Sequence, residues 1–111
     1  MHSFDLRVPT LRAAYRSGVT TPRRLIRELR ERAAALNGDY KLFIHLLSDA
    51  ELEPYLAALE SRDADTLPLL GIPFAIKDNI DLAGIPTTAA CPAFAYTPTE
   101  SATLAVWQVP Q

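Results

Sequence analysis

The sequence predicts an α/β fold in which helices come first and strands follow. Three stretches between residues 10 and 59 place apolar side chains at the three- and four-residue spacing of amphipathic helices. After them, an apolar run at 70–77 opens with glycine and proline and is followed by Asp78 and Asn79, a pattern typical of a short buried strand that ends in a turn. We therefore expect helices on the N-terminal side of the chain and the first strands of a sheet behind them.

The first two predicted helices carry clear start and stop signals. Thr10 is suited to cap a helix of about two turns, which Gly18 stops. Thr21 offers the cap of the second helix, and Pro22 suits its first helical position. We expect the Asn-Gly pair at 37–38 to end this helix.

The third predicted helix follows an apolar link. Ser48 and Glu51 form a capping-box pattern, and an apolar stripe follows at Leu52, Tyr55, Leu56 and Leu59. The link at 42–47 is interpreted as a buried strand or a short apolar connection. His45 within it is expected to be a hydrogen-bonded packing residue, and no catalytic role is assigned to it.

The second helix contains five arginines, so a nucleic-acid or acidic-protein surface has to be weighed. Glu28 and Glu31 lie within reach of these arginines along the helix, and no aromatic residue stands between them to stack on bases. The formal net charge of the chain is −2, which gives no field that attracts nucleic acid or an anionic membrane. We expect a solvated, ion-paired face and neither of those partners.

Lys77 stands at the end of the predicted strand and is the candidate functional residue. Strand alternation places it on the face of Ala75, opposite Phe74 and Ile76. A partly desolvated ammonium can work as a base or proton relay, whereas a solvated one stays protonated near neutrality. A packed stem with its head in water is the ordinary alternative, and the residues alone do not choose between the two.

Two stretches around Lys77 carry a family resemblance. GIPFAIKDNI at 71–80 and AGIPTT at 83–88 resemble the amidase signature family, the serine hydrolases with a Ser-cisSer-Lys triad, and Lys77 stands where that family keeps its lysine. The continuation at 89–98 and the stretch at 42–47 look most like the allophanate hydrolase branch. The resemblance runs from about residue 10 to about residue 106.

The resemblance implies hydrolysis of a C–N amide bond in a small molecule, with allophanate, in urea degradation, as the favoured substrate and Lys77 as proton relay. It implies no metal or organic cofactor. The sequence has only isolated serines, at positions 3, 17, 48, 61 and 101, whereas the family's nucleophilic and bridging serines belong to a Gly/Ser-rich segment further along. Since one triad member of three is present, whether this chain is an enzyme stays open, and we expect it to be inactive alone.

The fold class that the resemblance implies is an N-terminal fragment of the amidase signature fold, with helices followed by the first strands of a mixed sheet. Residues 1–111 are then a partial amidase domain, with an atypical tail at about 107–111 that we interpret as a shifted frame or premature stop, natural or arising in assembly. The alternative is an interaction module or subunit that complements a separately encoded remainder. Either form could associate with the missing C-terminal part or with itself.

Three remaining features concern the cellular location of the chain and two alternative functional sites, at Cys91 and at the acidic loop 78–81. The single cysteine, Cys91, rules out an intrachain disulfide framework, and the N-terminus has no secretion signal, so a cytoplasmic location is expected. We interpret Cys91 as a small buried residue in an extended conformation before Pro92, and a thiol nucleophile with His45 as base as the less favoured alternative. The acidic loop at 78–81 is interpreted as a turn whose side chains bond their own backbone, with a cation site as the alternative.

Overall fold

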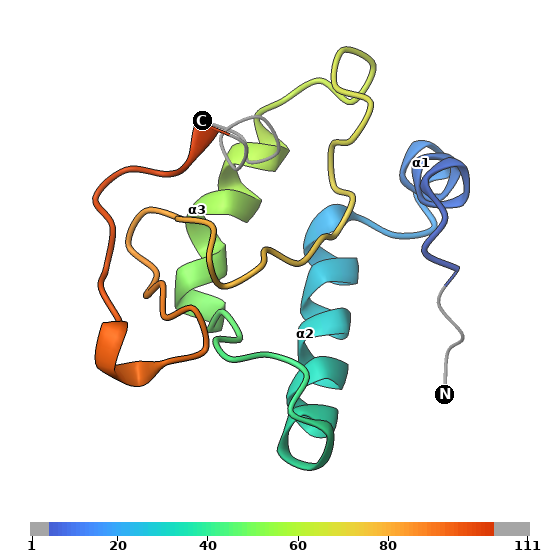
Figure 1. Ribbon diagram of the computed structural model, residues 1–111. Helices are drawn as coiled ribbons and strands as arrows, with labels where there is room; N and C mark the ends of the chain where they lie inside the picture. Colours follow the sequence, from blue (N-terminus) through green and yellow to red (C-terminus); the bar gives the residue numbers. More distant parts are fainter. Residues whose placement is uncertain (1–4, 104–111) are drawn as a thin grey trace.

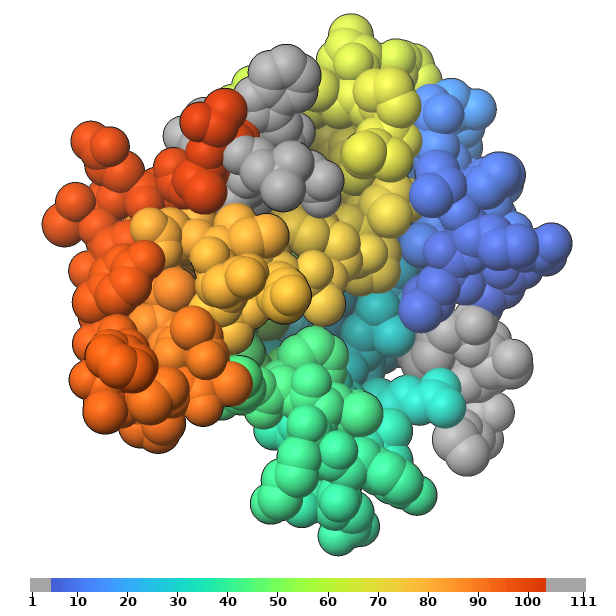
Figure 2. Space-filling view, in the orientation of Figure 1, coloured from blue at the N-terminus to red at the C-terminus, as the bar shows by residue number. Residues whose placement is uncertain are grey.

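The computed structural model describes residues 5–103, so the tail at 107–111 lies outside the described residues. Its elements are α1 (Val8–Ser17), α2 (Pro22–Tyr40), α3 (Asp49–Glu60) and a short 3-10 turn, η1 (Pro92–Phe94). Helices α2 and α3 lie side by side, and α1 stands apart from them across a short connection (Figure 1). The chain from 61 to 103 runs across the helices as an irregular segment and covers much of the face seen in Figure 2.

The predicted helix caps are largely confirmed. The Thr21 hydroxyl accepts a hydrogen bond from the backbone N–H of Arg24 at 3.2 Å, and Ser48 and Glu51 form the reciprocal capping box. Gly18 ends α1 in the left-handed conformation, with φ of 76°. The predicted cap at Thr10 is wrong, because Thr10 lies inside α1: Arg7 takes the extended conformation of the N-cap, and a proline follows in the first turn.

The predicted end of α2 is wrong by about one turn. The helix continues through the Asn-Gly pair to Tyr40, and Lys41 takes the left-handed position with φ of 52°. The side chain of Asn37 has another task, since its Oδ1 accepts from the N–H of Phe43 at 2.7 Å and its Nδ2 donates to the carbonyl of Phe43 at 3.2 Å. Asn37 therefore holds the chain that returns toward α3.

The helical part of the α/β prediction is confirmed, and residues 5–103 contain no sheet. Residues 72–77 take no regular secondary structure, and the link at 42–47 is a connection without strand pairing. Within residues 5–103 the β pairing consists of an isolated antiparallel bridge between Thr87 and Tyr96. A strand needs a ladder partner for its backbone groups, and the described chain provides none beside 72–77.

The apolar core of the described residues is thin. Its buried members are Leu11, Leu25, Leu56 and Leu82. Many large apolar side chains remain exposed, among them Leu42, Ile44, Leu69, Phe74 and Phe94. Large contiguous patches of exposed apolar side chains are typical of interaction surfaces.

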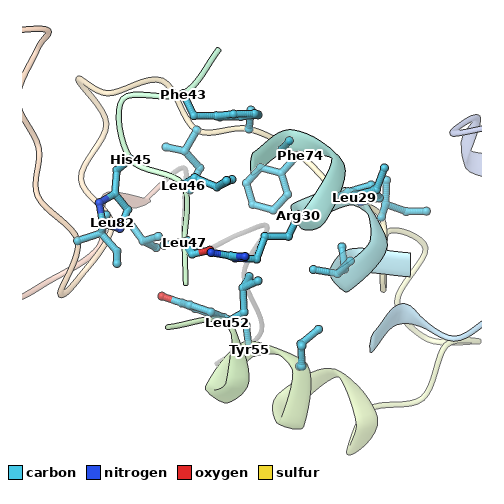
Figure 3. Close-up of a pocket in the computed structure, with 18 of the residues that line it drawn as sticks. Leu29, Arg30, Phe43, His45, Leu46, Leu47, Leu52, Tyr55, Phe74 and Leu82 are labelled. Carbon is cyan, nitrogen blue, oxygen red and sulfur yellow. The ribbon is translucent and has the colours of Figure 1, made fainter. Parts of the chain in front are cut away.

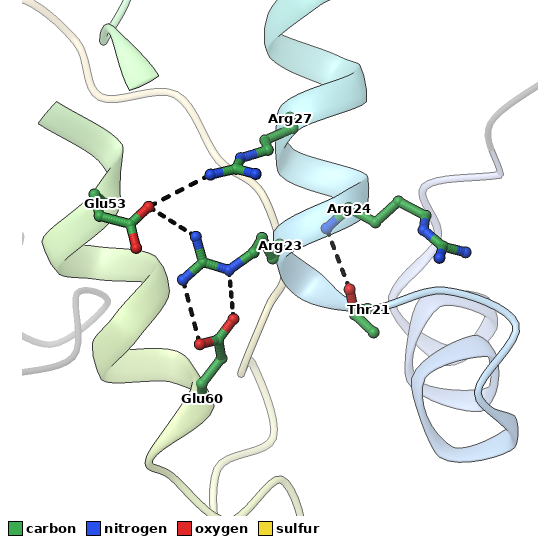
Figure 4. Close-up of polar contacts among 6 residues, drawn as sticks. All are labelled: Thr21, Arg23, Arg24, Arg27, Glu53 and Glu60. Carbon is green, nitrogen blue, oxygen red and sulfur yellow. Dashed lines mark hydrogen bonds and ion pairs between the residues drawn. The ribbon is translucent and has the colours of Figure 1, made fainter. Parts of the chain in front are cut away.

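An arginine cluster joins α2 to α3. Arg23 donates to Glu60 at 2.5 Å and to Glu53 at 2.7 Å, and Arg27 approaches Glu53 at 3.5 Å (Figure 4). The prediction of an ion-paired face holds for these two arginines, but their carboxylate partners come from α3 and not from Glu28 or Glu31 of the same helix. The cluster therefore joins α2 to α3 through charged side chains on their surface.

Candidate functional site

A large concavity is open, apolar and bordered by both long helices. It has a volume of about 1410 Å³ and is bounded by α2, the link at 42–47, α3 and the segment at 67–77. Figure 3 shows Phe43, Leu46 and Phe74 along one side and Leu52 and Tyr55 of α3 along the other. Lys77 lies on its lining. Pockets for small molecules usually measure about 300–1,000 Å³, so this one is large for a single small substrate.

Two polar contacts fix the link at 42–47 on the rim of the cavity. Arg30 of α2 donates through Nε to the carbonyl of Leu47 at 2.6 Å. His45 contacts both carboxylate oxygens of Glu51 at 3.1 Å through Nε2, and the backbone N–H of Ser48, followed by His45, lowers the pKa of Glu51. His45 is thus hydrogen-bonded as expected, but it is exposed and not packed in the interior, and its bond ties the link to the first turn of α3.

The segment that leads to Lys77 begins at a tightly fitted glycine. Gly71 has φ of +75°, and a Cβ there would lie 2.8 Å from side-chain atoms of Pro22 and of Tyr15. The Tyr15 hydroxyl donates to the Gly71 carbonyl at 2.6 Å, and burial raises the pKa of Tyr15 to about 12. Helix α1 therefore holds the start of the segment, a contact that the sequence pattern did not indicate.

Lys77 itself is exposed, and its carbonyl accepts from the N–H of Ile80 at 2.9 Å to close the predicted turn. Within residues 5–103 its ammonium has no ion-pair partner.

Asp78 departs from the expected turn chemistry. Its carboxylate accepts from the N–H of Thr88 at 3.0 Å and of Ala90 at 3.1 Å, and from the Thr88 hydroxyl in a short contact. These bonds, the Thr88 hydroxyl first, lower the pKa of Asp78 because they favour the charged form. The prediction that this side chain bonds its own local backbone is therefore wrong, since its partners lie ten and twelve residues further along.

The turn that Asp78 holds has an unusual backbone. Ala89 and Ala90 both have positive φ, 48° and 61°, a region that costs a residue with a Cβ about 1–2 kcal/mol. The N–H of Ala89 donates to the Asp78 carbonyl at 3.1 Å, and that of Cys91 to the Thr88 carbonyl at 2.8 Å. No local sequence signal indicated this turn, because alanine has no preference for it.

A second carboxylate organises the chain on the other side of the turn. Asp81 accepts from the hydroxyl of the buried Thr87 at 2.9 Å and from that of Tyr96 at 2.5 Å. The hydrogen bond to Asp81 raises the pKa of Tyr96. The hydroxyls of Thr87 and Thr88 are thus each bound by a carboxylate of the 78–81 loop.

The remaining candidates from the sequence are the Cys91 thiol and a cation site. Cys91 is half-buried and extended before Pro92, with φ of −128° and ψ of 105°. Among residues 5–103 no three acidic, histidine or cysteine side chains gather where they could hold a metal ion. A search of the same residues finds no helix with the length and apolarity that a membrane crossing requires.

Comparison with known proteins identifies the family. The family profile described as Amidase matches residues 24–107. The chain is 52% identical over 59 residues to urea amidolyase of Saccharomyces cerevisiae, a match that covers 52% of this chain and 3% of that protein. It is 48% identical over 63 residues to urea amidolyase of Lachancea kluyveri, covering 56% of this chain and 3% of the relative.

A third relative comes from bacteria. A glutamyl-tRNA(Gln) amidotransferase subunit of Deinococcus radiodurans is 37% identical over 78 residues, which are 70% of this chain and 16% of the relative. The chain thus spans less than a fifth of the length of each of these three proteins. Because the family profile covers most of the chain and the motifs at 71–80 and 83–88 lie inside the match, the chain belongs to the amidase signature family, in which it resembles the allophanate hydrolase branch.

Proposed function

We propose that this chain supplies the lysine of a Ser-cisSer-Lys amide hydrolase, with Lys77 as that residue. The observation that carries the proposal is the GIPFAIKDNI motif at 71–80, which lies within the family match and places Lys77 on the lining of the large cavity. The complete enzyme would hydrolyse the C–N bond of a small carboxamide or urea derivative in the cytoplasm. Allophanate is the favoured substrate, supported by the resemblance at 89–98 and by the two urea amidolyases.

In this proposal Lys77 moves protons and the remaining parts of the catalytic site come from elsewhere in the domain. A lysine relay takes the proton from the attacking serine through the bridging serine and returns it to the leaving nitrogen. The four described serines are occupied at helix ends and turns, namely Ser17, Ser48, Ser61 and Ser101. We therefore expect the 111-residue chain alone to release no ammonia from allophanate.

A chimera tests the role of Lys77. The matched segment of this chain replaces the corresponding segment of the yeast urea amidolyase, and ammonia release from allophanate is measured. Lys77→Arg keeps the positive charge but cannot give up its proton near neutral pH, so the rate should fall about 10²–10⁴-fold, the usual contribution of general acid–base catalysis.

Lys41→Arg is the matched control, because Lys41 is the other lysine of the sequence and ends α2 on an exposed surface. Its rate should stay unchanged. Equal rates for the Lys77→Arg and Lys41→Arg chimeras would refute the proposal. Activity on simple carboxamides but not on allophanate would keep the role of Lys77 and reject the substrate.

A second candidate is a subunit that complements a separately made remainder, and one observation favours it. Within residues 5–103 the backbone N–H groups of residues 74–76 and the carbonyl groups of residues 73–76 form no hydrogen bond, and the segment lines the apolar cavity. Free strand edges of this kind pair with an added strand. The isolated chain should accordingly bind apolar dyes and self-associate.

Mixing decides between the candidates. The purified chain is combined with a yeast urea amidolyase from which the matched segment has been deleted, and activity and complex size are measured. Recovery of hydrolysis that depends on Lys77 would support the second candidate. Activity in the covalent chimera alone would instead support a segment that works only within one chain.

A further inference from the structure

We propose that Asp78 is a positioning residue that locks the turn at 88–91 in its left-handed form and thereby holds the backbone that carries Lys77. The inference rests on the proposed function, because the position of this backbone matters only if Lys77 takes part in the reaction. The Asp78 side chain follows the lysine directly in sequence, and its carboxylate is hydrogen-bonded to a segment ten to twelve residues further along.

The geometry shows that one residue gathers three successive backbone donors. Oδ1 of Asp78 accepts from the N–H of Thr88 and Oδ2 from that of Ala90, while the main-chain carbonyl of Asp78 accepts from the N–H of Ala89. The Thr88 hydroxyl donates to Oδ2 as well. Charge-assisted hydrogen bonds of this kind are stronger than neutral ones, so the turn is defined chiefly by Asp78.

Packing does not explain the turn. The side chains of Ala89 and Ala90 are both exposed, and alanine, unlike glycine, avoids positive φ. Neighbouring left-handed alanines persist only where their surroundings over-determine them, and such positions gather at functional sites. The surroundings here are the Asp78 carboxylate and carbonyl, with two further bonds inside the turn: the Thr88 hydroxyl accepts from the N–H of Ala90, and the Thr88 carbonyl accepts from the N–H of Cys91.

The consequence for Lys77 follows from the chain connection. The carbonyl of Lys77 is fixed by Ile80 on one side, and the residue after it is fixed by the turn. The backbone that carries the ammonium is therefore held on two sides, in a segment that has no ladder. Rates in active sites are sensitive to displacements of about 1 Å, so releasing the turn should affect catalysis without removing a reacting group.

The first test uses hydrogen exchange in the 111-residue chain and does not depend on activity. Asp78→Asn keeps the side-chain shape but turns one oxygen into a donor that faces the donors of Thr88 and Ala90. We expect the amides of Thr88 and Ala90 to exchange about tenfold faster. Asp63→Asn is the matched control, because Asp63 accepts a backbone N–H from Asp65 in another exposed turn and should leave these amides unchanged.

The second test uses the chimera with yeast urea amidolyase. Asp78→Asn should lower kcat about tenfold or more, leave KM unchanged and lower the melting temperature only slightly, since the lost bonds lie in one exposed turn. Glycine at both 89 and 90 in the Asp78→Asn background removes the penalty of positive φ and should restore most of kcat. A merely structural role would lower the melting temperature and leave kcat of the folded enzyme alone, which would overturn the proposal.

Two further comparisons separate a failure of the Asp78 inference from a failure of the proposed function. If the Asp78→Asn chimera does not fold, Thr88→Val removes one donor, keeps the backbone, and should still give a smaller loss of kcat; no loss would contradict the inference. If Lys77→Arg is fully active, the proposed function fails, whereas unchanged exchange in the Asp78→Asn chain refutes the clamp itself. The two failures are therefore separate measurements.

Discussion

The helical region at 5–60 and the irregular region at 61–103 are held together by different kinds of contact. In the helical region the backbone groups bond to neighbours three or four residues away, and caps at Thr21 and Ser48 complete the helix ends. In the irregular region the carboxylates of Asp78 and Asp81 collect donors from residues six to fifteen positions further along. The first kind of order is local, and the second depends on the chain returning to the same place.

The largest effect should come from breaking the join between the two regions at Gly71. Gly71→Ala forces a Cβ to within 2.8 Å of Pro22 and Tyr15 and demands φ of +75° from alanine, so we expect about 3 kcal/mol of destabilisation in urea unfolding. Gly84→Ala is the control, since Gly84 has φ of +79° but open space around it, and should lose about 1 kcal/mol. Equal losses would contradict a close approach at Gly71.

A smaller effect should come from the local order of α3. Ser48→Ala removes the acceptor of the Glu51 N–H at 3.1 Å and should cost about 1 kcal/mol of helix stability, read as lost circular dichroism. Ser61→Ala is the matched change at the other end of the helix, where the hydroxyl donates to the carbonyl of Ala58, and it should be nearly silent. A silent Ser48→Ala would show that the local caps do not carry the helical region.

The next effect is a loss of folding stability at alkaline pH, which tests the contact between α1 and the segment that leads to Lys77. Burial raises the pKa of Tyr15 from 10.0 to about 12, so the phenol ionises less readily in the folded chain. The stability gained from the neutral Tyr15–Gly71 bond is therefore fully present below pH 10 and is lost as the pH rises toward 12. Because Tyr15 is only half-buried, solvent reduces the size of the loss.

The pH dependence of unfolding measures this loss, and Tyr15→Phe is the reference because it cannot ionise. The stability of the Tyr15→Phe chain should fall less steeply between pH 10 and 12 than that of the unchanged chain. Parallel curves would mean that Tyr15 ionises equally in the folded and unfolded chain.

The smallest effect should come from the ion pairs between α2 and α3. Arg23→Gln removes the donor to Glu53 and Glu60 and should destabilise the chain slightly at low salt, and less at 1 M salt, where the Debye length falls to about 3 Å. Arg24→Gln is the control, because Arg24 contributes its backbone N–H to the Thr21 cap (Figure 4). A loss that does not change with salt would point to packing by the arginine stem.

The difference between the regions also explains which features the sequence predicts. Gly18, Thr21 and Ser48 act on groups within four residues, so short patterns suffice to place three helices. The end of α2 was misplaced because Asn37 bonds to Phe43 across the turn, a contact that competes with the usual meaning of an Asn-Gly pair.

The candidate site was predicted unevenly for the same reason. The position of Lys77 before a turn followed from the motif, and the family followed from its length and specificity. The partners of Asp78, the left-handed turn at 88–91 and the fit at Gly71 depend on residues far apart in sequence. The expected strand at 70–77 failed because a strand exists only with a partner, and pairing cannot be read from the apolar run by itself.

The two-sided bond of Asn37 also governs the chemical ageing of the chain. An asparagine before glycine loses ammonia when the glycine nitrogen attacks the side-chain amide, and a helical backbone keeps that nitrogen turned away. Here Gly38 lies inside α2, and both ends of the Asn37 amide are bound to Phe43. Conversion to aspartate would replace the donor to the Phe43 carbonyl with an acceptor. Deamidation should therefore occur when this end of α2 unfolds, and the aspartate formed should then weaken its refolding.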